Sequence, residues 1–399
     1  MDTATIFLFC GVVLLLTAAT FGLRSLLKYT DYGVDPAIIE TFKPRIRTWW
    51  MLFGLLACAF FLGPIFTVFF FFLLSIIILR EYITLTPKSP ADHQTLFGIY
   101  VVFTPLQFAL IGINPDWFIQ VTGVAPYQVF SLLLPGCVFL ILPGMMAISG
   151  DPKRFLERTA KLQLGLIVCV YSLSYAPALL TLDLPNGTQK AEPAPAAVMN
   201  LNLQETVIAT LTATEEPTEE PNEHAKTECQ PDAVTETVPD AEPTPNNGND
   251  GYAPQLFRIL PIISGQHFQL LFFFILIVQL SDVFQYLGSR ASRRYVVAGK
   301  INSNRTWEGL LGSMMTTAIV GVGLWYFTPF SQWWHAGLAA MLVSLMGFLG
   351  SMTMSAIKRD RGVGSYGALI PGHSGFLDRI DSLCFAAPVF YHFVWYFAG

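Results

Sequence analysis

Two carboxylates, Asp378 and Asp381, lie three residues apart in a short polar segment between two long apolar runs near the C-terminus. If the helix of the second run starts early enough to include them, both acids share one helical face and can hold one or two divalent cations. Arg379, between them, can neutralise the acids or bind phosphate. Charged groups are costly at membrane depth, so such a segment usually marks a site. We therefore predict chemistry on phosphate groups and metal ions.

Cations and glycines precede these acids. Lys358 and Arg359 end the first apolar run, and a structural alternative is that their side chains simply extend to the membrane interface. The following segment contains five glycines, Gly362, Gly364, Gly367, Gly372 and Gly375. Glycine has no side chain, so the backbone there can approach a polyanion closely. His373 within it is either a phosphate donor or a turn residue, and the sequence leaves both interpretations open.

A second polar segment upstream adds another acid, Asp282. It shares a helical face with Gln279 and with Gln285 or Tyr286. An ionised aspartate beside the bilayer needs a cation, a metal ion or a water-filled cleft. The alternative is a pairing with Arg290, two turns later on the same helix. We favour a functional acid, because a pairing with Arg290 does not explain the flanking glutamines.

The same segment ends with a cation and an acid. Arg305 offers a forked set of donors that suits phosphate oxygens. Glu308 opens a long apolar run, which is typical of a helix start with Thr306 as N-cap and the acid in the first turn. Such a helix start can also present free backbone amides to a phosphate, so the two interpretations are compatible.

The composition predicts the elements that position these residues. Hydrophobic residues make up 53% of the 399 and charged residues only 13%, whereas soluble domains carry roughly 25% charged residues, so this is a membrane protein. A span needs about 20 apolar residues. Long runs of the sequence lack charge, namely 3–23, 48–79, 93–115, 117–150, 162–182, 259–281, 309–357 and 382–399. The run 48–79 breaks at Gly63-Pro64 and the run 309–357 breaks near Thr328-Pro329, so each is read as two helices. The sequence thus predicts an all-α polytopic bundle of about ten transmembrane helices.

Charge predicts the topology and three regions of the chain. Lysines and arginines gather in alternate connections, which places the N-terminus outside and both polar segments on the cytoplasmic side. Residues 183–254 contain 14 acidic and 2 basic side chains and ten prolines, a composition that predicts a disordered extracytoplasmic insert. The insert separates N-terminal transmembrane helices, residues 1–182, from a C-terminal catalytic region, residues 255–399.

The two polar segments together resemble the CDP-diacylglycerol synthase (phosphatidate cytidylyltransferase) family of integral membrane enzymes. The residues that match the family's signature at its spacing are Ser355, Lys358, Arg359, Pro371, Gly372, His373, Gly375, Asp378, Arg379 and Asp381. Ser281-Asp282 and Thr306-Trp-Glu-Gly309 look like the companion motifs, and the resemblance is best over residues 266–399. A Lys-Asp pair of the signature is replaced by Gly364-Ser365, which removes one cation and one carboxylate.

The resemblance implies that CTP and phosphatidate give CDP-diacylglycerol and pyrophosphate, with Mg²⁺ as cofactor. It implies that Asp282, Asp378 and Asp381 hold the metal. Phosphate or substrate binding falls to Lys358, Arg359, Arg305, Arg379, Gly372, Gly375 and Glu308, with His373 as a supporting donor. The expected partners are CTP, phosphatidate and the bilayer of a bacterial inner membrane, and not nucleic acid; a homodimer stays open.

Two other functions compete with this one. The chain can be a catalytically degenerate member that acts as a membrane scaffold or lipid-binding protein, for which Gly364-Ser365 is the argument. It can also be a transporter, although a transporter favours repeated halves and charges at the bilayer midplane, whereas the chemistry here concentrates at the inner face.

Overall fold

The computed structural model describes residues 3–28, 46, 50, 53–54, 57, 62–85, 92–148, 151–182, 184, 265–292, 294–363 and 375–398. Met1–Thr188 and Leu256–Gly399 belong to one compact unit. The predicted insert 183–254 lies outside the described residues apart from Leu184.

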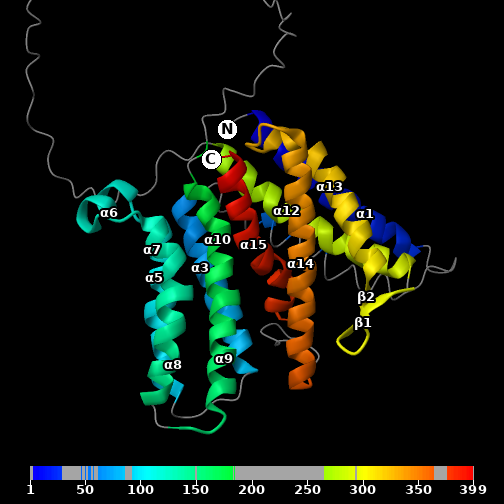
Figure 1. Ribbon diagram of the computed structural model, residues 1–399. Coiled ribbons are helices and arrows are strands. Elements are labelled where there is room, and N and C mark those ends of the chain that lie inside the picture. Colours follow the sequence, from blue (N-terminus) through cyan, green and yellow to red (C-terminus); the bar gives the residue numbers. More distant parts are fainter. Residues whose placement is uncertain are drawn as a thin grey trace, which may run out of the picture. The chain divides into compact units, whose positions relative to one another are not determined.

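The elements of the N-terminal region are all helices within its described parts, joined by turns and short connections (Figure 1). Its elements are α1 Thr3–Lys28, α3 Pro64–Thr84, α4 His93–Gly98, η3 Ile99–Phe103, α5 Thr104–Gly112, α6 Pro115–Thr122, α7 Pro126–Leu132, η4 Leu133–Val138, α8 Phe139–Ile148, α9 Phe155–Leu166, η5 Ile167–Ser172, α10 Leu173–Ala178 and η6 Leu179–Thr181. The predicted break at Gly63-Pro64 is confirmed. Gly63 has a φ of 96°, which glycine adopts readily, and Pro64 begins α3 with the φ that a first helical turn needs.

The described part of the C-terminal region contains four α-helices, one short 3₁₀-helix and one short hairpin. These are α12 Gly265–Ala291, β1 Val296–Ala298, β2 Asn302–Thr306, α13 Trp307–Gly323, η8 Trp325–Phe327, α14 Trp333–Arg361 and α15 Leu377–Ala398. The strands pair antiparallel, so the segment that carries Arg305 is extended rather than helical. The predicted break near Thr328-Pro329 is confirmed by the end of α13 and the start of α14.

Five of the described helical stretches are long and apolar enough to cross a membrane: Pro64–Thr84, His93–Gly112, Phe155–Thr181, Gly265–Ala291 and Trp333–Arg361. A sixth results if the pair Pro126–Gly136 and Phe139–Ile148, bent by 43°, counts as one span. The all-α membrane bundle is therefore confirmed, whereas the number of about ten spans is not.

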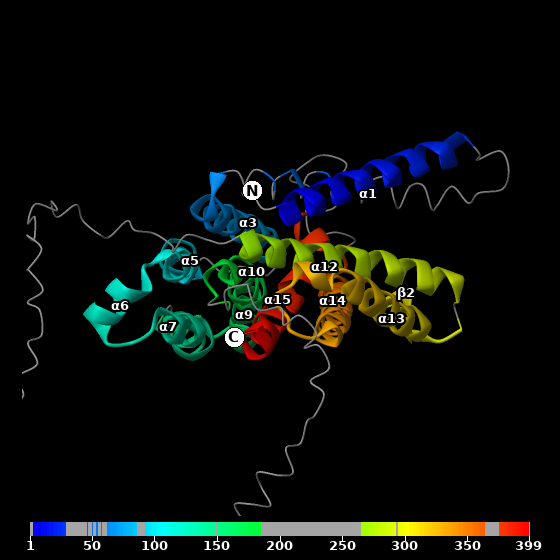
Figure 2. The ribbon, with the colours of Figure 1, turned by 90° about the horizontal axis from the view of Figure 1, so that it is seen from above.

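Helix α14 lies between α13 and α15 in the C-terminal region, and α12 packs across α13 and α14 (Figure 2). Glycines permit the closest approaches. A Cβ on Gly321 of α13 would lie 2.6 Å from the Cβ of Ala340 on α14, and one on Gly350 of α14 would lie 2.8 Å from the Phe385 ring of α15. Because α15 also contacts α3 and α10, it joins the two transmembrane regions.

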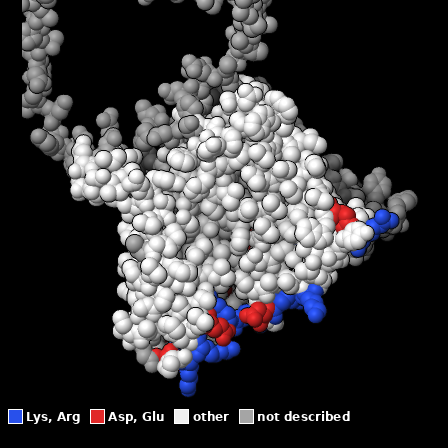
Figure 3. Space-filling model, in the orientation of Figure 1, with Lys and Arg blue, Asp and Glu red and all other residues white. Residues whose placement is uncertain are grey.

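Most charged side chains on the face seen in Figure 3 gather along its lower edge, at the end where α9 begins and α14 ends, and a smaller charged group lies at the right-hand margin, while the body of that face is free of charge. Ion pairs link these two helix ends: Arg361 Nη2 lies 3.1 Å from Glu157 Oε1, and Lys161 Nζ lies 3.9 Å from Asp360 Oδ2. Two connections that the sequence assigns to one side of the membrane thus lie together in the fold.

Candidate functional site

The first turns of α15 carry both acids of the C-terminal motif. The helix begins at Leu377, five residues before its charge-free run, so Asp378 and Asp381 lie on the helix. The early start that the sequence requires for a shared site is therefore confirmed. Arg379 lies half-buried between the acids, and Gly375 is buried just before the helix.

Asp282 and Asp381 come together at Ser382, which lies 100 positions after Asp282 in the sequence. The Ser382 hydroxyl lies 3.0 Å from Asp282 Oδ1 and 3.5 Å from Asp381 Oδ1, and it can donate to either. The backbone N–H of Ser382 donates to Asp381 Oδ1 at 2.8 Å. Burial raises the pKa of Asp381, which precedes the apolar run of α15, to about 7, and the charge of Asp282 adds to the rise. Two shielded acids this close favour a cation between them.

Arg305 of β2 is the cation that the structure places beside this acid pair. Its guanidinium donates to the Gln285 side chain and, at 2.7 Å, to Ser351 Oγ, and it lies 3.9 Å from Asp282 Oδ1. Asp282 thus pairs with Arg305, and the alternative pairing with Arg290 stays a prediction. The predicted phosphate contact of Arg305 stays a prediction.

A buried network of hydroxyl groups holds Gln285 in place. Gln285 Nε2 donates to Ser281 Oγ and to the Ser344 carbonyl, each at 3.1 Å. Ser281 donates to Ser344 Oγ at 2.9 Å, and Ser313 Oγ lies 3.1 Å from the same atom. Gln285, Ser313 and Ser344 are fully buried. The network joins α12, α13 and α14 and fixes the partner of Arg305, a role that sequence analysis did not assign to these residues.

Asp378 has a different partner. Lys358 Nζ, at the end of α14, lies 2.8 Å from Asp378 Oδ1. The neighbouring Arg359 donates through Nε to the carbonyl of Ile301 in the hairpin at 3.3 Å. Within the described ranges, no group of three or more His, Cys, Asp or Glu side chains is arranged to hold a metal. The charge of Asp378 nevertheless adds to the rise in the pKa of Asp381, and the assignment of Asp282, Asp378 and Asp381 to a metal ion stays a prediction. The pair Asp282 and Asp381 still fits Mg²⁺, which commonly takes one or two carboxylates and completes its shell with water and substrate phosphates.

Glu308 begins α13 as the helix-start interpretation predicts. Thr306 Oγ1 accepts from the Gly309 N–H at 3.0 Å, which confirms the N-cap. Glu308 Oε1 accepts from the Tyr295 N–H at 3.2 Å and so holds the base of the hairpin. Its Oε2 is buried and has no hydrogen-bond partner among the atoms that the structure describes.

Several predicted site residues lie outside the described residues, namely Gly372, His373 and the Gly364-Ser365 replacement. In contrast, the structure adds an acid that sequence analysis passed over. Glu81 of α3 is 2% exposed, and its two oxygens accept from the backbone N–H groups of Phe376 and Leu377. A lone acid near the end of an apolar run was the available signal.

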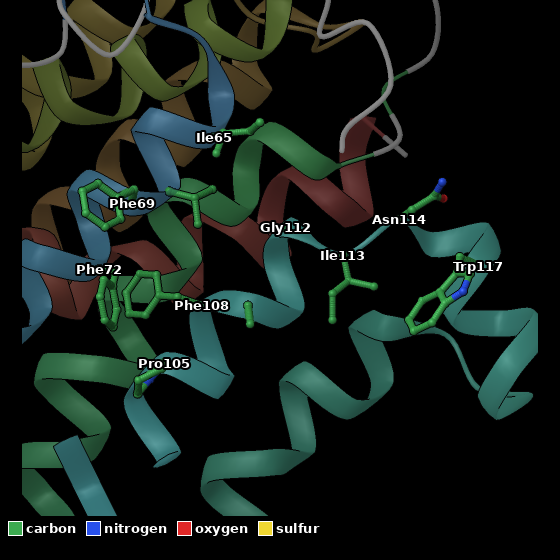
Figure 4. Close-up of a pocket in the computed structure, with 11 residues that line it drawn as sticks. Ile65, Phe69, Phe72, Pro105, Phe108, Gly112, Ile113, Asn114 and Trp117 are labelled. Carbon is green, nitrogen blue, oxygen red and sulfur yellow. The ribbon is translucent and has the colours of Figure 1, made fainter. Parts of the chain in front are cut away.

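An apolar cavity of about 530 Å³ lies elsewhere, between α3, α5 and α6 (Figure 4). It is lined by the first turns of α3, whereas Glu81 lies in the last turn of that helix. Phe69, Phe72, Phe108 and Trp117 line it, with Asn114 as a polar neighbour. The cavity is therefore separate from the acidic site.

Comparison with known proteins identifies the family. Residues 43–397 match the model of the family described as "Cytidylyltransferase family". The uncharacterized protein YnbB of Escherichia coli (strain K12) is 30% identical over 356 residues, which cover 88% of this chain and 87% of that protein. A phosphatidate cytidylyltransferase of Staphylococcus aureus is 36% identical over 127 residues, or 31% of this chain and 48% of that protein. A phosphatidate cytidylyltransferase of Synechocystis sp. is 43% identical over 99 residues, which cover 24% of this chain and 32% of that protein.

The chain thus spans about half or less of the phosphatidate cytidylyltransferases that it matches, whereas the family match covers most of this chain and the match to YnbB covers most of both proteins. The acids, the cation and the helix start described above lie within the matched residues. The chain therefore belongs to the cytidylyltransferase family.

Proposed function

We propose that this protein is a phosphatidate cytidylyltransferase, which converts CTP and phosphatidate to CDP-diacylglycerol and pyrophosphate. The observation that carries the proposal is the meeting of Asp282 and Asp381 at the Ser382 hydroxyl, with Arg305 against the first acid. Family membership and the partial matches to phosphatidate cytidylyltransferases support the choice of substrates.

In this reaction a phosphate oxygen of phosphatidate attacks the α-phosphorus of CTP, and the bond from that phosphorus to the bridging oxygen breaks as pyrophosphate leaves. Such transfer depends on positioning and on neutralising negative charge more than on covalent catalysis. Asp282 and Asp381 would hold Mg²⁺. A bound Mg²⁺ supplies positive charge against the phosphate oxygens.

The protein's own cations have separate tasks in the proposal. The guanidinium of Arg305 lies against the Asp282 carboxylate and is itself held by Gln285 and Ser351, so it would balance negative charge at the metal site. Lys358 pairs with Asp378, Arg359 follows Lys358 on α14, and Arg379 follows Asp378 on α15. These three cations are the groups that would orient the triphosphate and the lipid phosphate.

The location of the site suits two substrates of unlike solubility. Asp378 and Asp381 lie in the first turns of α15, and Lys358, which pairs with Asp378, lies in the last turn of α14 with Arg359 and Arg361. We propose that this end faces the cytoplasm of a bacterial cell, with ten spans, the N-terminus outside and the protein in the inner membrane. A nucleotide from water then meets a lipid that stays in the bilayer.

The decisive experiment supplies purified protein with labelled CTP and phosphatidate, with and without Mg²⁺. The expected result is Mg²⁺-dependent formation of CDP-diacylglycerol and pyrophosphate. A prenyl phosphate offered in parallel tests the acceptor: transfer to it and not to phosphatidate would overturn the proposed substrate. A protein that consumes no CTP with either acceptor would overturn the proposed activity.

The degenerate alternative has its own test, because it depends on the sequence Gly364-Ser365. The double variant Gly364→Lys with Ser365→Asp restores the cation and the carboxylate of the family signature. We expect the natural chain to be active already and the double variant to change its rate little. An inactive natural chain that gains activity in the double variant would establish a decayed site.

A further inference from the structure

Glu81 is a buried acid to which the reaction assigns no task. It lies in the last turn of α3 and is 2% exposed. Its Oε2 lies 2.9 Å from the backbone nitrogen of Leu377, and its Oε1 lies 3.0 Å from that of Phe376. The two nitrogens belong to the start of α15, 295 and 296 residues further along the chain.

These contacts satisfy a need of α15. The first amides of a helix have no acceptor within it and carry partial positive charge. A carboxylate with both oxygens on two such amides binds them more strongly than a neutral cap does. A buried carboxylate is costly without donors, so Glu81 and the start of α15 stabilise each other.

The two amides are next to the acids of the site. Leu377 directly precedes Asp378, and Asp381 follows one turn later. From the other side, Asp378 is held by Lys358 of α14. The first turn of α15 is thus fixed at its backbone by α3 and at a side chain by α14. The segment just before it, residues 364–374, lies outside the described residues.

We propose that Glu81 is a positioning residue for the acidic site: its carboxylate sets where α15 begins and so places Asp378 and Asp381. Because those acids matter for catalysis only if the chain transfers cytidylyl groups, this role rests on the proposed function. Glu81 gives the N-terminal helices a direct part in the geometry of the C-terminal site.

The test compares Glu81→Gln and Glu81→Asp with a matched control. Glutamine keeps the size of the side chain but offers a single oxygen, whereas aspartate keeps two charged oxygens on a stem one methylene shorter. Asp151→Asn is the control, because Asp151 is also a carboxylate that accepts a backbone N–H, that of Lys153 at 3.1 Å, and pairs with Arg158 before α9.

Three measurements are made on the purified full-length proteins. Hydrogen exchange of peptides covering 375–382 follows the start of α15. Titration with Mn²⁺, monitored by electron paramagnetic resonance, follows the metal site without substrate. Steady-state kinetics separate kcat from the KM for CTP. We expect Glu81→Gln to speed exchange at 376–381 and to lower Mn²⁺ affinity and kcat on the order of 10–100-fold, as loss of supporting contacts does. The KM for CTP should change much less than kcat. In exchange rate, Mn²⁺ affinity and kcat, Glu81→Asp should fall between Glu81→Gln and the natural protein, and Asp151→Asn should match the natural protein.

Glu81→Gln with natural Mn²⁺ affinity and kcat would overturn the proposal, even if its melting temperature fell, because a merely structural link would give that result. Exchange and Mn²⁺ binding need no turnover. If the natural protein consumes no CTP, the proposed function fails, and these two measurements still decide whether Glu81 positions the acids.

Discussion

Lys358 Nζ lies 2.8 Å from Asp378 Oδ1, and this ion pair joins the last turns of α14 to the first turn of α15. Both side chains are largely shielded, with 22% of the lysine and 11% of the aspartate exposed. Removing one partner of a shielded pair leaves the other charge uncompensated. The pair therefore stabilises the site, and it also places a cation where phosphate would arrive.

Substituting either partner should impair catalysis. We expect Asp378→Asn to abolish Mg²⁺-dependent transfer and Lys358→Met to lower kcat/KM by about 100-fold, because each change misplaces the remaining charge. In the double variant, the activation free energy should rise by less than the sum of the rises in the two single variants, since the two residues are in contact. Assays with labelled CTP measure all three proteins. Full turnover by Asp378→Asn would refute its part in the site.

Asp282 and Asp381, the two acids at Ser382, should make the transfer reaction dependent on a divalent metal ion. We expect Asp282→Asn and Asp381→Asn each to weaken Mn²⁺ binding by about 10-fold or more, because each removes one of two carboxylates available to the ion. Removal of metal with EDTA should abolish transfer by the natural protein, and added Mg²⁺ should restore it. Metal titrations and CTP assays check both points.

Asp360→Asn is the matched control for these variants. Asp360 lies at the same end of α14 but is 67% exposed, and it pairs with Arg361 at 3.4 Å and Lys161 at 3.9 Å. We expect it to keep natural metal affinity, because its contacts lie on the side of α9. If Asp360→Asn lowered metal affinity as much as Asp381→Asn does, Asp360 would be replacing the carboxylate of the family's Lys-Asp pair, which Gly364-Ser365 lacks in this chain.

Local features of the site could be predicted from sequence, because local spacing encodes them. The break before Pro64 and the Thr306 cap each depend on a few adjacent residues, and the structure contains both. The acids of α15 could be placed on one helix for the same reason.

Contacts across the chain could not be predicted in this way. The partner of Arg305 is Gln285, 20 residues away in a different element, and that of Glu81 is the backbone of α15. Hydrophobic spacing identifies the buried face of a helix but not which polar group on a distant helix will meet it. In the same way, the spacing of the acids does not indicate that Asp378 pairs with Lys358 of α14, and the assignment of the three acids to one metal site stays a prediction.

Arg305 should not tolerate lysine. Its guanidinium contacts Gln285, Ser351 and Asp282 at once, and a lysine ammonium on a flexible stem cannot reproduce that fork. Arg305→Lys should lose about 10-fold or more in kcat/KM, and the buried Gln285 oxygen left without its donor should cost about 1–3 kcal/mol of stability. Arg361→Lys is the control, since its pairing with Glu157 needs only a point charge. Equal activity and melting temperature for the two variants would contradict this role.

Gly309 should be sensitive to a single added methyl group because α13 and α12 meet at its backbone. A Cβ there would lie 2.1 Å from Ser289 Oγ, 2.8 Å from Ser289 N and 3.0 Å from the Gln285 carbonyl. Backbone atoms cannot move aside without shifting α12, which carries Asp282. Gly309→Ala should therefore destabilise the protein by about 1–3 kcal/mol, as overpacking does, and should lower transfer activity at temperatures where the variant remains folded.

Gly312→Ala, one turn later on α13, separates crowding from a general effect of losing glycine. No heavy atom lies within 4 Å of a Cβ at that position. Because alanine favours helix over glycine by about 0.8–1 kcal/mol, this variant should be as stable as the natural protein or slightly more so, with natural activity. Thermal unfolding in detergent and the CTP assay measure both variants. If Gly309→Ala matched Gly312→Ala in both, the close approach of the helices would not be what holds Asp282 in place.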